Sequence, residues 1–136
     1  MRSTNGEDIG RLILRFTCGG LLLPHGLFKI FVEIESIKGM VSAAGLPPFL
    51  AYGTIIGEVL APVLLIVGWK ARIAAFVIAF NMLMSILIAH SDIMFRTNDY
   101  WGWMIELNVF FMMTAVSILL IGSGRYSLSL GKGRWD

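Results

Sequence analysis

Four long apolar stretches, separated by short polar segments, constrain this chain more than any other feature of its sequence. They run over residues 9–32, 49–69, 72–90 and 101–122. Each stretch has close to the ~20 residues that an α-helix needs to cross a hydrocarbon core of ~30 Å. The sequence therefore predicts an all-α integral membrane protein, a bundle of four transmembrane helices in a single domain over residues 1–136.

The composition agrees with a membrane location. Hydrophobic residues make up 57% of the chain, the mean hydropathy is +0.77, and charged residues account for 15%, against about 25% in soluble proteins. The excess of apolar side chains indicates contact with the lipid bilayer. Because Cys18 is the single cysteine, the chain cannot form an internal disulfide, a CxxC redox motif or a cysteine-based metal site. We expect no metal site, and no basic cluster indicates nucleic acid.

The first apolar stretch is the least regular, because it contains ionisable residues and a proline. These are Arg11, Arg15, Pro24, His25 and Lys29. A secretory signal peptide would have a cleaner apolar core and a cleavage site with small residues. Since neither feature is present, we expect this stretch to be a retained span.

The segments between the stretches predict how the helices connect. Residues 68–70 form a very short turn, so the second and third helices are expected to form a tight hairpin. Residues 33–48 form the longest predicted loop, which ends in Gly45-Leu46-Pro47-Pro48, a sequence that stops a helix. Residues 91–100 are polar and connect the third and fourth stretches.

Lys and Arg in the connections predict the orientation, because cytoplasmic loops carry an excess of both. One side of the membrane would collect Arg2, Arg11, Lys70, Arg72, Arg125, Lys132 and Arg134. The other side would hold only Lys38 and Arg96, beside Glu33, Glu35, Asp92 and Asp99. We therefore predict that both termini are cytoplasmic. Indole rings prefer the membrane interface, and the span ends carry Trp69, Trp101 and Trp103.

Five ionisable residues fall inside the predicted spans at compatible depths. Glu58 is nine residues beyond Phe49 in a helix that runs inward, which places it about 13 Å down at ~1.5 Å per residue. His25 and Lys29 are four residues apart and share one helix face. With the predicted topology, all four helices contribute to one polar cluster in the outer half of the membrane. Its members are His25, Lys29, Glu58, His90 and Glu106.

One interpretation of this cluster is structural. A buried ion pair between Glu58 and Lys29 would fix the first helix against the second, since such pairs set register more reliably than they add stability. Glu58 would otherwise hold a proton, because burial disfavours its charged form. The remaining groups also have simple explanations, which are snorkelling of Lys29 and Arg15 to water, an interfacial cap at His90 and a headgroup position for Glu106.

The other interpretation is functional. Ionisable groups within a membrane usually line a path or a binding site. The cluster would then form a polar pocket for a ligand or a proton, with His90 at its mouth. Asn81 and Asn108 are expected to be secondary polar residues that form hydrogen bonds between helices, worth about 1 kcal/mol each.

Several short motifs lie along residues 9–129. They are Gly10-Arg11-Leu12-Ile13-Leu14-Arg15, Pro24-His25-Gly26-Leu27-Phe28-Lys29, Gly45-Leu46-Pro47, Gly57-Glu58-Val59-Leu60-Ala61-Pro62, the His90 position, Gly102-Trp103 through Glu106, and Gly124-Arg125-Tyr126-Ser127-Leu128. In combination they resemble the DoxX family of small bacterial membrane proteins, which has DoxD-like relatives. Ser129 departs from the family pattern, in which an Asp commonly follows the Tyr-Ser-Leu run.

The resemblance implies a four-helix bundle in the bacterial inner (plasma) membrane. It also carries the family pattern over to His25, Lys29, Glu58, His90 and Glu106. The family name comes from association with a quinol oxidase, and DoxD-like relatives form part of a thiosulfate:quinone oxidoreductase. We therefore expect a redox-linked membrane subunit that handles a quinone or protons beside oxidoreductase subunits. The sequence has no flavin, dinucleotide or iron–sulfur motif, so we do not expect a stand-alone enzyme.

Two other classes of function stay open. The chain could carry or bind a small lipid-soluble or anionic solute, although it is too short for an inverted-repeat transporter. It could also be a structural or assembly partner of a membrane complex. A bis-histidine haem would need His25 and His90 on facing helices. We do not expect haem, because two interfacial histidines have simpler explanations.

Overall fold

A computed structural model of the chain describes residues 4–133 and 135–136. Within these residues the fold is helical, and the only extended pairing is an isolated antiparallel bridge between Thr97 and Trp103. The all-α class predicted from the sequence is therefore confirmed. Arg2 and Arg134, two of the basic residues used to predict the orientation, lie outside the described residues.

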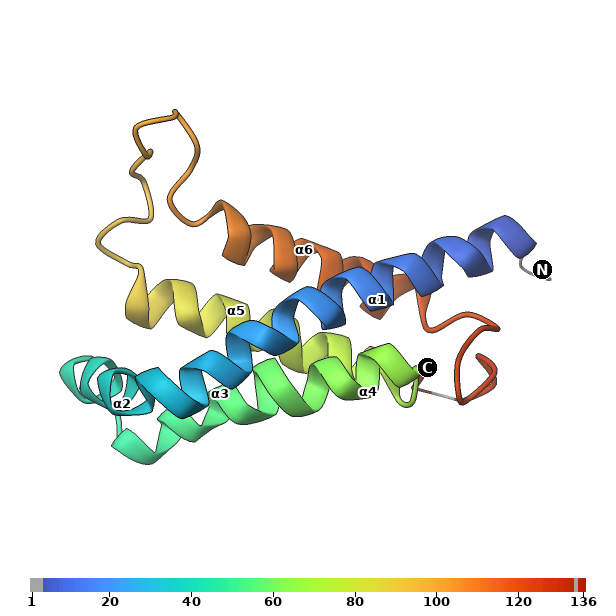
Figure 1. Cartoon of the computed structure of the whole chain (residues 1–136), viewed down its shortest axis with the longest axis horizontal. Coiled ribbons are helices and arrows are strands. Elements are labelled where there is room, and N and C mark those ends of the chain that lie inside the picture. Colours follow the sequence, from blue (N-terminus) through green and yellow to red (C-terminus); the bar gives the residue numbers. More distant parts are fainter. Residues whose placement is uncertain (1–3, 134) are drawn as a thin grey trace.

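Four helical rods pack side by side (Figure 1). The first contains α1 (Asn5–Phe28), the π-helical turn η1 (Lys29–Glu33) and α2 (Ile34–Ala43). The second contains the 3₁₀ turn η2 (Pro48–Tyr52), α3 (Gly53–Ile55), the π-helical turn η3 (Ile56–Leu60) and α4 (Ala61–Val67). The third and fourth rods are α5 (Ala71–Ala89) and α6 (Glu106–Ile121). α1 contacts α4 and α6, and α5 also contacts α4 and α6, which closes the bundle.

Local sequence accounts for where the rods begin and end. Thr4 and Glu7 form a capping box that satisfies the free amide groups at the start of α1. Gly68 ends α4 with φ +70°, and Lys70 follows with φ +49°, so the chain reverses within a few residues. This confirms the predicted tight hairpin between the second and third rods. Gly45, with φ +76°, follows α2 in the same way.

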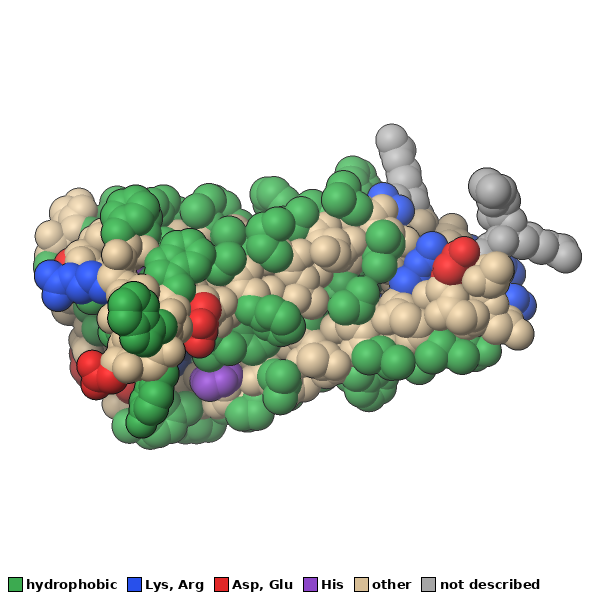
Figure 2. Space-filling model, turned by 90° about the horizontal axis from the view of Figure 1, so that it is seen from above, with side chains coloured by type: hydrophobic (Ala, Val, Ile, Leu, Met, Phe, Trp, Pro, Cys, Tyr) green, Lys and Arg blue, Asp and Glu red, His purple; other side chains and the backbone are tan. Residues whose placement is uncertain are grey.

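Three helical segments are long and apolar enough to cross a membrane, and they are Asn5–Ala43, Pro48–Val67 and Ala71–Ala89. α6 is also apolar, but with 16 residues it is shorter than these three segments. Large hydrophobic side chains point outward along the rods, among them Phe76, Phe80 and Phe110. Figure 2 shows hydrophobic side chains along the whole length of the molecule, while charged residues gather toward its two ends. These features are those of a helical membrane protein.

Two predicted boundaries were wrong. Residues 34–43 form α2 and not a loop, because the Glu and Lys residues of this segment are good helix formers and the first turn signals come at Gly45 and Pro47. The fourth helix begins at Glu106 and not at Trp101. Trp101 has φ +63°, which an α-helix does not allow. The side-chain oxygen of Asn98 also accepts the amides of Tyr100 and Gly102, which forms a turn in front of α6.

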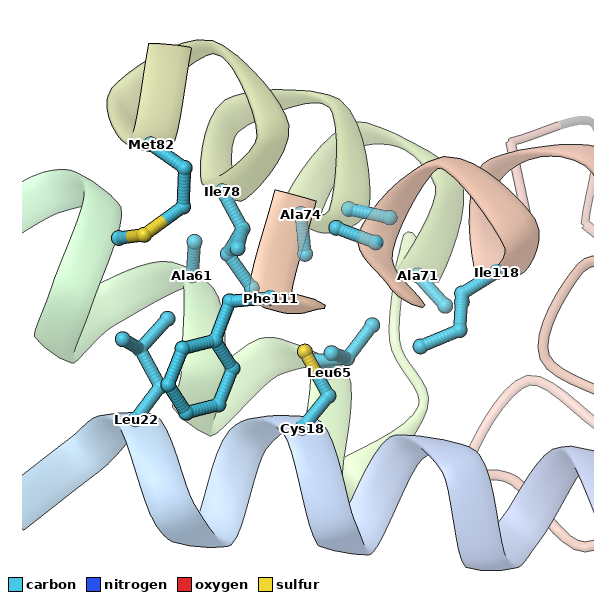
Figure 3. Packing of buried hydrophobic residues seen from close by; sticks show 12 residues of the cluster. Cys18, Leu22, Ala61, Leu65, Ala71, Ala74, Ile78, Met82, Phe111 and Ile118 are labelled. Carbon is cyan, nitrogen blue, oxygen red and sulfur yellow. The ribbon is translucent and has the colours of Figure 1, made fainter. Parts of the chain in front are cut away.

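The core lies along the axis between the rods (Figure 3). It combines a few large side chains with alanines, which let the helices approach closely. The large members are Leu22, Leu65, Ile78, Met82, Phe111 and Ile118. α1 faces this core with a stripe of buried residues at heptad-like spacing, which are Asp8, Arg15, Cys18, Leu22 and Gly26. Ionisable residues lie near both ends of this stripe, and the kinds of hydrogen-bond partner that they have differ between the two ends.

Candidate functional site

The Lys29–Glu58 pair lies at the end of the buried stripe of α1 that is farther from the N-terminus. The Nζ atom of Lys29 is 2.7 Å from Oε1 of Glu58. The Glu58 side chain is 1% exposed, whereas that of Lys29 is 28% exposed. This contact confirms the prediction that the two residues pair through the bundle interior. The pair joins the first rod to the second, as its structural interpretation requires.

Asn81 of α5 completes the centre that we call the Glu58 centre, which consists of Lys29, Glu58 and Asn81. The Nδ2 atom of Asn81 donates to the same oxygen, Oε1, at 3.0 Å. The second oxygen, Oε2, is buried and has no hydrogen-bond partner among the described residues. A buried carboxylate oxygen without a partner is costly. The centre is therefore open to a proton or to a donor from a bound molecule.

Unusual backbone surrounds the Glu58 centre. Lys29 begins η1 and Glu58 lies within η3, so both partners belong to π-helical turns. Such turns are rare and occur often at functional sites. Two glycines let the rods meet closely there. A Cβ atom at Gly26 would lie 2.7 Å from Cβ of Glu58, and one at Gly57 would lie 2.5 Å from Cβ of Asn81.

A second polar group lies on α5 and α6. Ser85 is one helical turn from Asn81 on the same face of α5. Its hydroxyl oxygen is 3.3 Å from Nδ2 of Asn108, and its carbonyl oxygen is 3.1 Å from Nδ1 of His90. Asn81 and Asn108 thus both form hydrogen bonds between rods, as predicted. Ser85 was not a candidate in the sequence, because an isolated serine in an apolar helix carries no distinguishing signal.

His25 and Glu106 are placed differently from the other candidates. Both are exposed on the surface of the bundle, and no hydrogen bond or ion pair joins either of them to the Glu58 centre. The ring of His25 packs edge-on against that of Phe111, with centroids 6.3 Å apart. Glu106 is the first residue of α6. Within the described residues, no group of three or more His, Cys, Asp or Glu side chains is arranged to hold a metal ion.

Comparison with known proteins identifies the family. The DoxX family model matches residues 10–91, more than half of the chain. The chain belongs to the DoxX family. It is also similar to a Bacillus subtilis (strain 168) protein named "Putative oxidoreductase CatD", with 28% identity over 116 residues, which cover 85% of this chain and 81% of that protein. No solved structure matches the chain. The matched region of this DoxX protein includes Lys29, Glu58, Asn81, Ser85 and His90.

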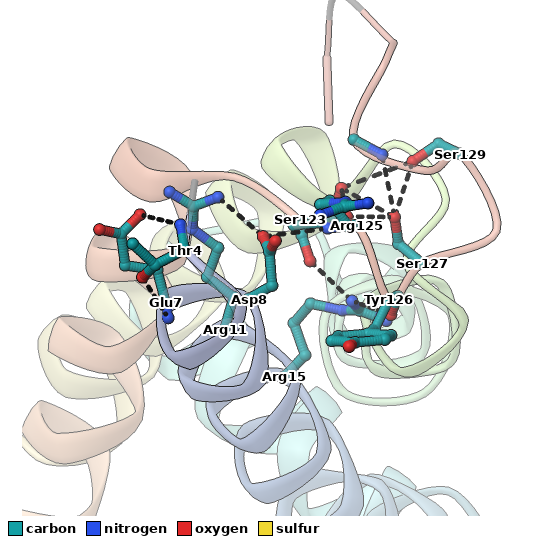
Figure 4. A network of polar contacts seen from close by, with 12 residues as sticks. Thr4, Glu7, Asp8, Arg11, Arg15, Ser123, Arg125, Tyr126, Ser127 and Ser129 are labelled. Atoms are coloured by element: carbon teal, nitrogen blue, oxygen red, sulfur yellow. Dashed lines mark hydrogen bonds and ion pairs between the residues drawn. The ribbon is translucent and has the colours of Figure 1, made fainter. Parts of the chain in front are cut away.

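At the other end of the stripe, this DoxX chain buries a second charge. The Arg15 side chain is 1% exposed and donates to four main-chain carbonyl oxygens. Figure 4 shows it pointing toward Ser123 and Tyr126. The acceptors belong to the end of α4 and to the segment after α6, and they are Leu65 at 2.9 Å, Ile66 at 2.7 Å, Ser123 at 2.7 Å and Tyr126 at 2.9 Å. We call this group the Arg15 centre. The simplest interpretation of the sequence was that Arg15 snorkels to water. The structure buries it instead.

Asp8 extends the polar network around the Arg15 centre. This carboxylate is 1% exposed, lies 3.3 Å from Nη1 of Arg11 and accepts the amide of Arg125 at 3.2 Å. The segment after Gly122 is thus bound to the start of α1 as well as to α4. Sequence reasoning did not select Asp8 or Arg15. Their heptad-like spacing with Cys18 and Leu22 was the signal that could have indicated burial.

A surface cavity of about 300 Å³ lies beside α5, α6 and the C-terminal segment, and no residue of either centre lines it. Its lining combines side chains of α5, α6 and the C-terminal segment, which are Arg72, Ile73, Phe76, Leu119 and Trp135. The Nε atom of Arg72 donates to the main-chain oxygen of Asp136 at 2.8 Å. None of the predicted site residues contributes to this cavity, so the candidate site remains the Glu58 centre.

Proposed function

We propose that this DoxX protein is a redox-linked subunit of the bacterial inner membrane that binds a quinone headgroup and exchanges protons at the Glu58 centre. In this proposal a partner oxidoreductase subunit supplies the electrons. Reduction of a quinone to a quinol consumes two electrons and two protons, so a protonatable group beside the carbonyl oxygens would serve the reaction. The name of the similar Bacillus subtilis protein places a relative in oxidoreductase chemistry.

The observation that carries the proposal is the unequal pairing of the two Glu58 oxygens. Lys29 and Asn81 both donate to Oε1, and Oε2 has no partner among the described residues. When protonated at Oε2, Glu58 would donate to a carbonyl oxygen of the quinone. When ionised, it would remain compensated by Lys29. The unpaired Oε2 is thus the atom of the centre at which a ligand would form its hydrogen bond.

A quinone titration tests this function. A short-chain benzoquinone would be added to the purified chain in lipid vesicles, with quenching of tryptophan fluorescence as the readout. We expect Glu58→Ala to weaken binding about twofold to tenfold, since a hydrogen bond between neutral groups is worth ~0.5–1.5 kcal/mol. Glu35→Ala is the matched control, because Glu35 also pairs with a lysine but is exposed. Equal affinity in wild type and Glu58→Ala would exclude the assignment of Glu58.

A structural role is the second candidate, and the close packing at Gly26 favours it. The first and second rods touch there without room for a side chain, so the Lys29–Glu58 pair would act as a register lock between them. This role would make the chain an assembly partner within a membrane complex. It predicts that wild-type protein does not bind quinone, while Glu58→Ala still lowers the stability of the bundle.

The proposal also includes four crossings with both termini in the cytoplasm. Both ends of the chain lie at one end of the bundle (Figure 1), as an even number of crossings requires. Lys70, Arg72 and Arg125 lie toward the same end, in line with the excess of basic residues on cytoplasmic sides. Reporter fusions after residues 40 and 97 should report the outside, and a fusion after Lys132 should report the inside. A C-terminal fusion that reports the outside would contradict this topology.

A further inference from the structure

The connection between α5 and α6 exposes aromatic side chains to an unusual degree. Phe95, Tyr100 and Trp101 are 91%, 91% and 90% exposed. Figure 1 shows this connection projecting sideways from the bundle, at the end opposite the chain termini. Tyr and Trp have an apolar ring and a polar tip, and both are enriched where hydrocarbon meets headgroups. Three aromatic side chains exposed to this degree within one connection favour a partner surface.

The length of α6 indicates what this surface is. Its 16 residues span about 24 Å at ~1.5 Å per residue, which falls short of a hydrocarbon core of ~30 Å. A helix that is too short leaves its flanking residues to cover the difference. The apolar surface of the bundle continues into the connection through exposed Leu87 on α5 and exposed Leu107 on α6. The connection is thus placed at the edge of the hydrocarbon layer.

The backbone of the connection is arranged for a medium with little water. Four of the five amide groups in residues 98–102 donate hydrogen bonds within the connection, two of them to the side-chain oxygen of Asn98. The indole nitrogen of Trp103 donates to the carbonyl of Met94. Internal pairing of this kind is what non-helical backbone needs near lipid. Asp92, Arg96 and Asp99 are exposed charges that keep the connection at headgroup level.

We propose that residues 91–105 form an interfacial hairpin, which lies in the headgroup region of the leaflet opposite the chain termini and inserts Phe95, Tyr100 and Trp101 toward the hydrocarbon. The partner is a lipid surface. The hairpin completes the span of α6 and holds its outer end in the membrane. This role is independent of quinone binding, so either proposal can fail alone.

Spin-label accessibility tests the hairpin. A nitroxide would be attached at Tyr100→Cys, and separately at Phe95→Cys, in a Cys18→Ala background within phospholipid vesicles. Collision rates would be measured with oxygen, which concentrates in lipid, and with a water-soluble nickel complex. Phe80→Cys on the outer face of α5 is the lipid control, and Lys132→Cys in the exposed C-terminal segment is the water control.

We expect both labels to give an oxygen-to-nickel ratio below that at mid-span Phe80 but several-fold above that at Lys132. A ratio equal to that at Lys132 would overturn the proposal, because the aromatic side chains would then lie in water. Low collision rates with both reagents would overturn it as well, since the side chains would be covered by protein, as in a contact between copies of the chain. The two label positions guard against a local effect of either substitution.

Discussion

The two ends of α1 bury charge in opposite ways. Near the chain termini, the Arg15 guanidinium donates to four main-chain carbonyl oxygens. Toward the other end, Glu58 relies on the side chains of Lys29 and Asn81, and one of its oxygens has no partner among the described residues. In the first arrangement, four of the five N–H groups of the guanidinium donate to main-chain acceptors, which are fixed in place. In the second arrangement, Oε2 of Glu58 is left without a hydrogen-bond partner, and a binding site needs such a group to contact its ligand.

The chemistry of the two groups strengthens this contrast. Arginine stays protonated in proteins and offers a planar fork of donors. Two of its acceptors here, Leu65 and Ile66, lie in the last turn of α4, where carbonyl groups lack helical partners and the helix dipole is negative. The Arg15 centre therefore holds a permanent charge in a permanent place. The partners of Glu58 are side chains, which can change rotamer, so this arrangement is less fixed than one of main-chain groups.

The backbone differs between the two centres as well. Arg15 projects from a regular part of α1, whereas Lys29 and Glu58 each belong to a π-helical turn. Such turns are rare and occur often at functional sites. The difference supports the proposal of a stabilising Arg15 centre and a ligand-binding Glu58 centre.

The largest expected effect concerns the Arg15 centre. Arg15→Ala would remove the side-chain donor from four buried or partly buried carbonyl groups and release the segment after α6. Among the described residues, only the carbonyl of Leu65 also accepts a backbone amide, that of Gly68. We expect the free energy of unfolding to fall by about 3–5 kcal/mol, since each buried acceptor left without a donor costs ~1–3 kcal/mol. The measurement is unfolding by titration with a denaturing detergent, together with protease cleavage after Gly122.

Two further variants show whether geometry or charge matters at this position. Arg15→Lys should recover part of the stability, because an ammonium group keeps the charge but lacks the planar fork. Ile13→Ala is the control on the same helix, since the Ile13 side chain is 59% exposed. If Arg15→Ala were no worse than Ile13→Ala, the Arg15 centre would not be the structural member of the comparison.

The next effect concerns the Glu58 centre. Lys29→Ala would strand a buried carboxylate, so we expect a loss toward the lower end of ~3–5 kcal/mol. Glu58→Gln should be mild, since a neutral amide does not need a counter-ion. The same unfolding titration gives both values. A milder effect of Lys29→Ala than of Glu58→Gln would show that Glu58 is already neutral in the bundle, and that Lys29 does not compensate a charge.

Much of the Glu58 centre could be predicted because its signals are periodic. Helical spacing placed Lys29 on the face of His25, and span depth placed Glu58 at a matching level, so their pairing followed from topology. The third partner, Asn81, was expected only as a hydrogen-bond donor between helices. The surface positions of His25 and Glu106 depend on how far each helix rotates about its axis, which depth alone does not determine.

The Arg15 centre could not be predicted, because its acceptors are main-chain carbonyl groups. Every residue has a carbonyl group, so no residue type marks Leu65 or Ser123 as a partner 50 or 108 positions away. The π-helical turns could not be predicted from the sequence for a related reason, since they follow from packing between rods and not from local propensity. The start of α6 was misplaced because apolar Trp101 and Trp103 extend the hydrophobic stretch into a turn.

A smaller effect is expected from the packing beside the Glu58 centre. In Gly26→Ala the added methyl group would overlap Cβ and the carbonyl oxygen of Glu58, so α1 must move away from η3. Overpacking of this kind costs about 1–3 kcal/mol, and it should weaken quinone binding as well. Gly20→Ala is the control, because nothing lies within 4 Å of a Cβ atom at that position of α1. Its unfolding midpoint should stay the same or rise slightly.

The smallest expected effect on stability concerns a second ion pair, which has the same N–O distance as Lys29–Glu58 but a different exposure to solvent. Lys38 and Glu35 are also 2.7 Å apart, but the Glu35 side chain is 81% exposed. Water solvates an exposed carboxylate with or without its partner, and holding two long side chains together costs entropy. We therefore expect Lys38→Ala to leave the unfolding midpoint unchanged, in contrast to Lys29→Ala. If the two variants were equally destabilising, burial would not be what distinguishes the Glu58 centre, and the functional reading of its unpaired oxygen would lose its physical basis.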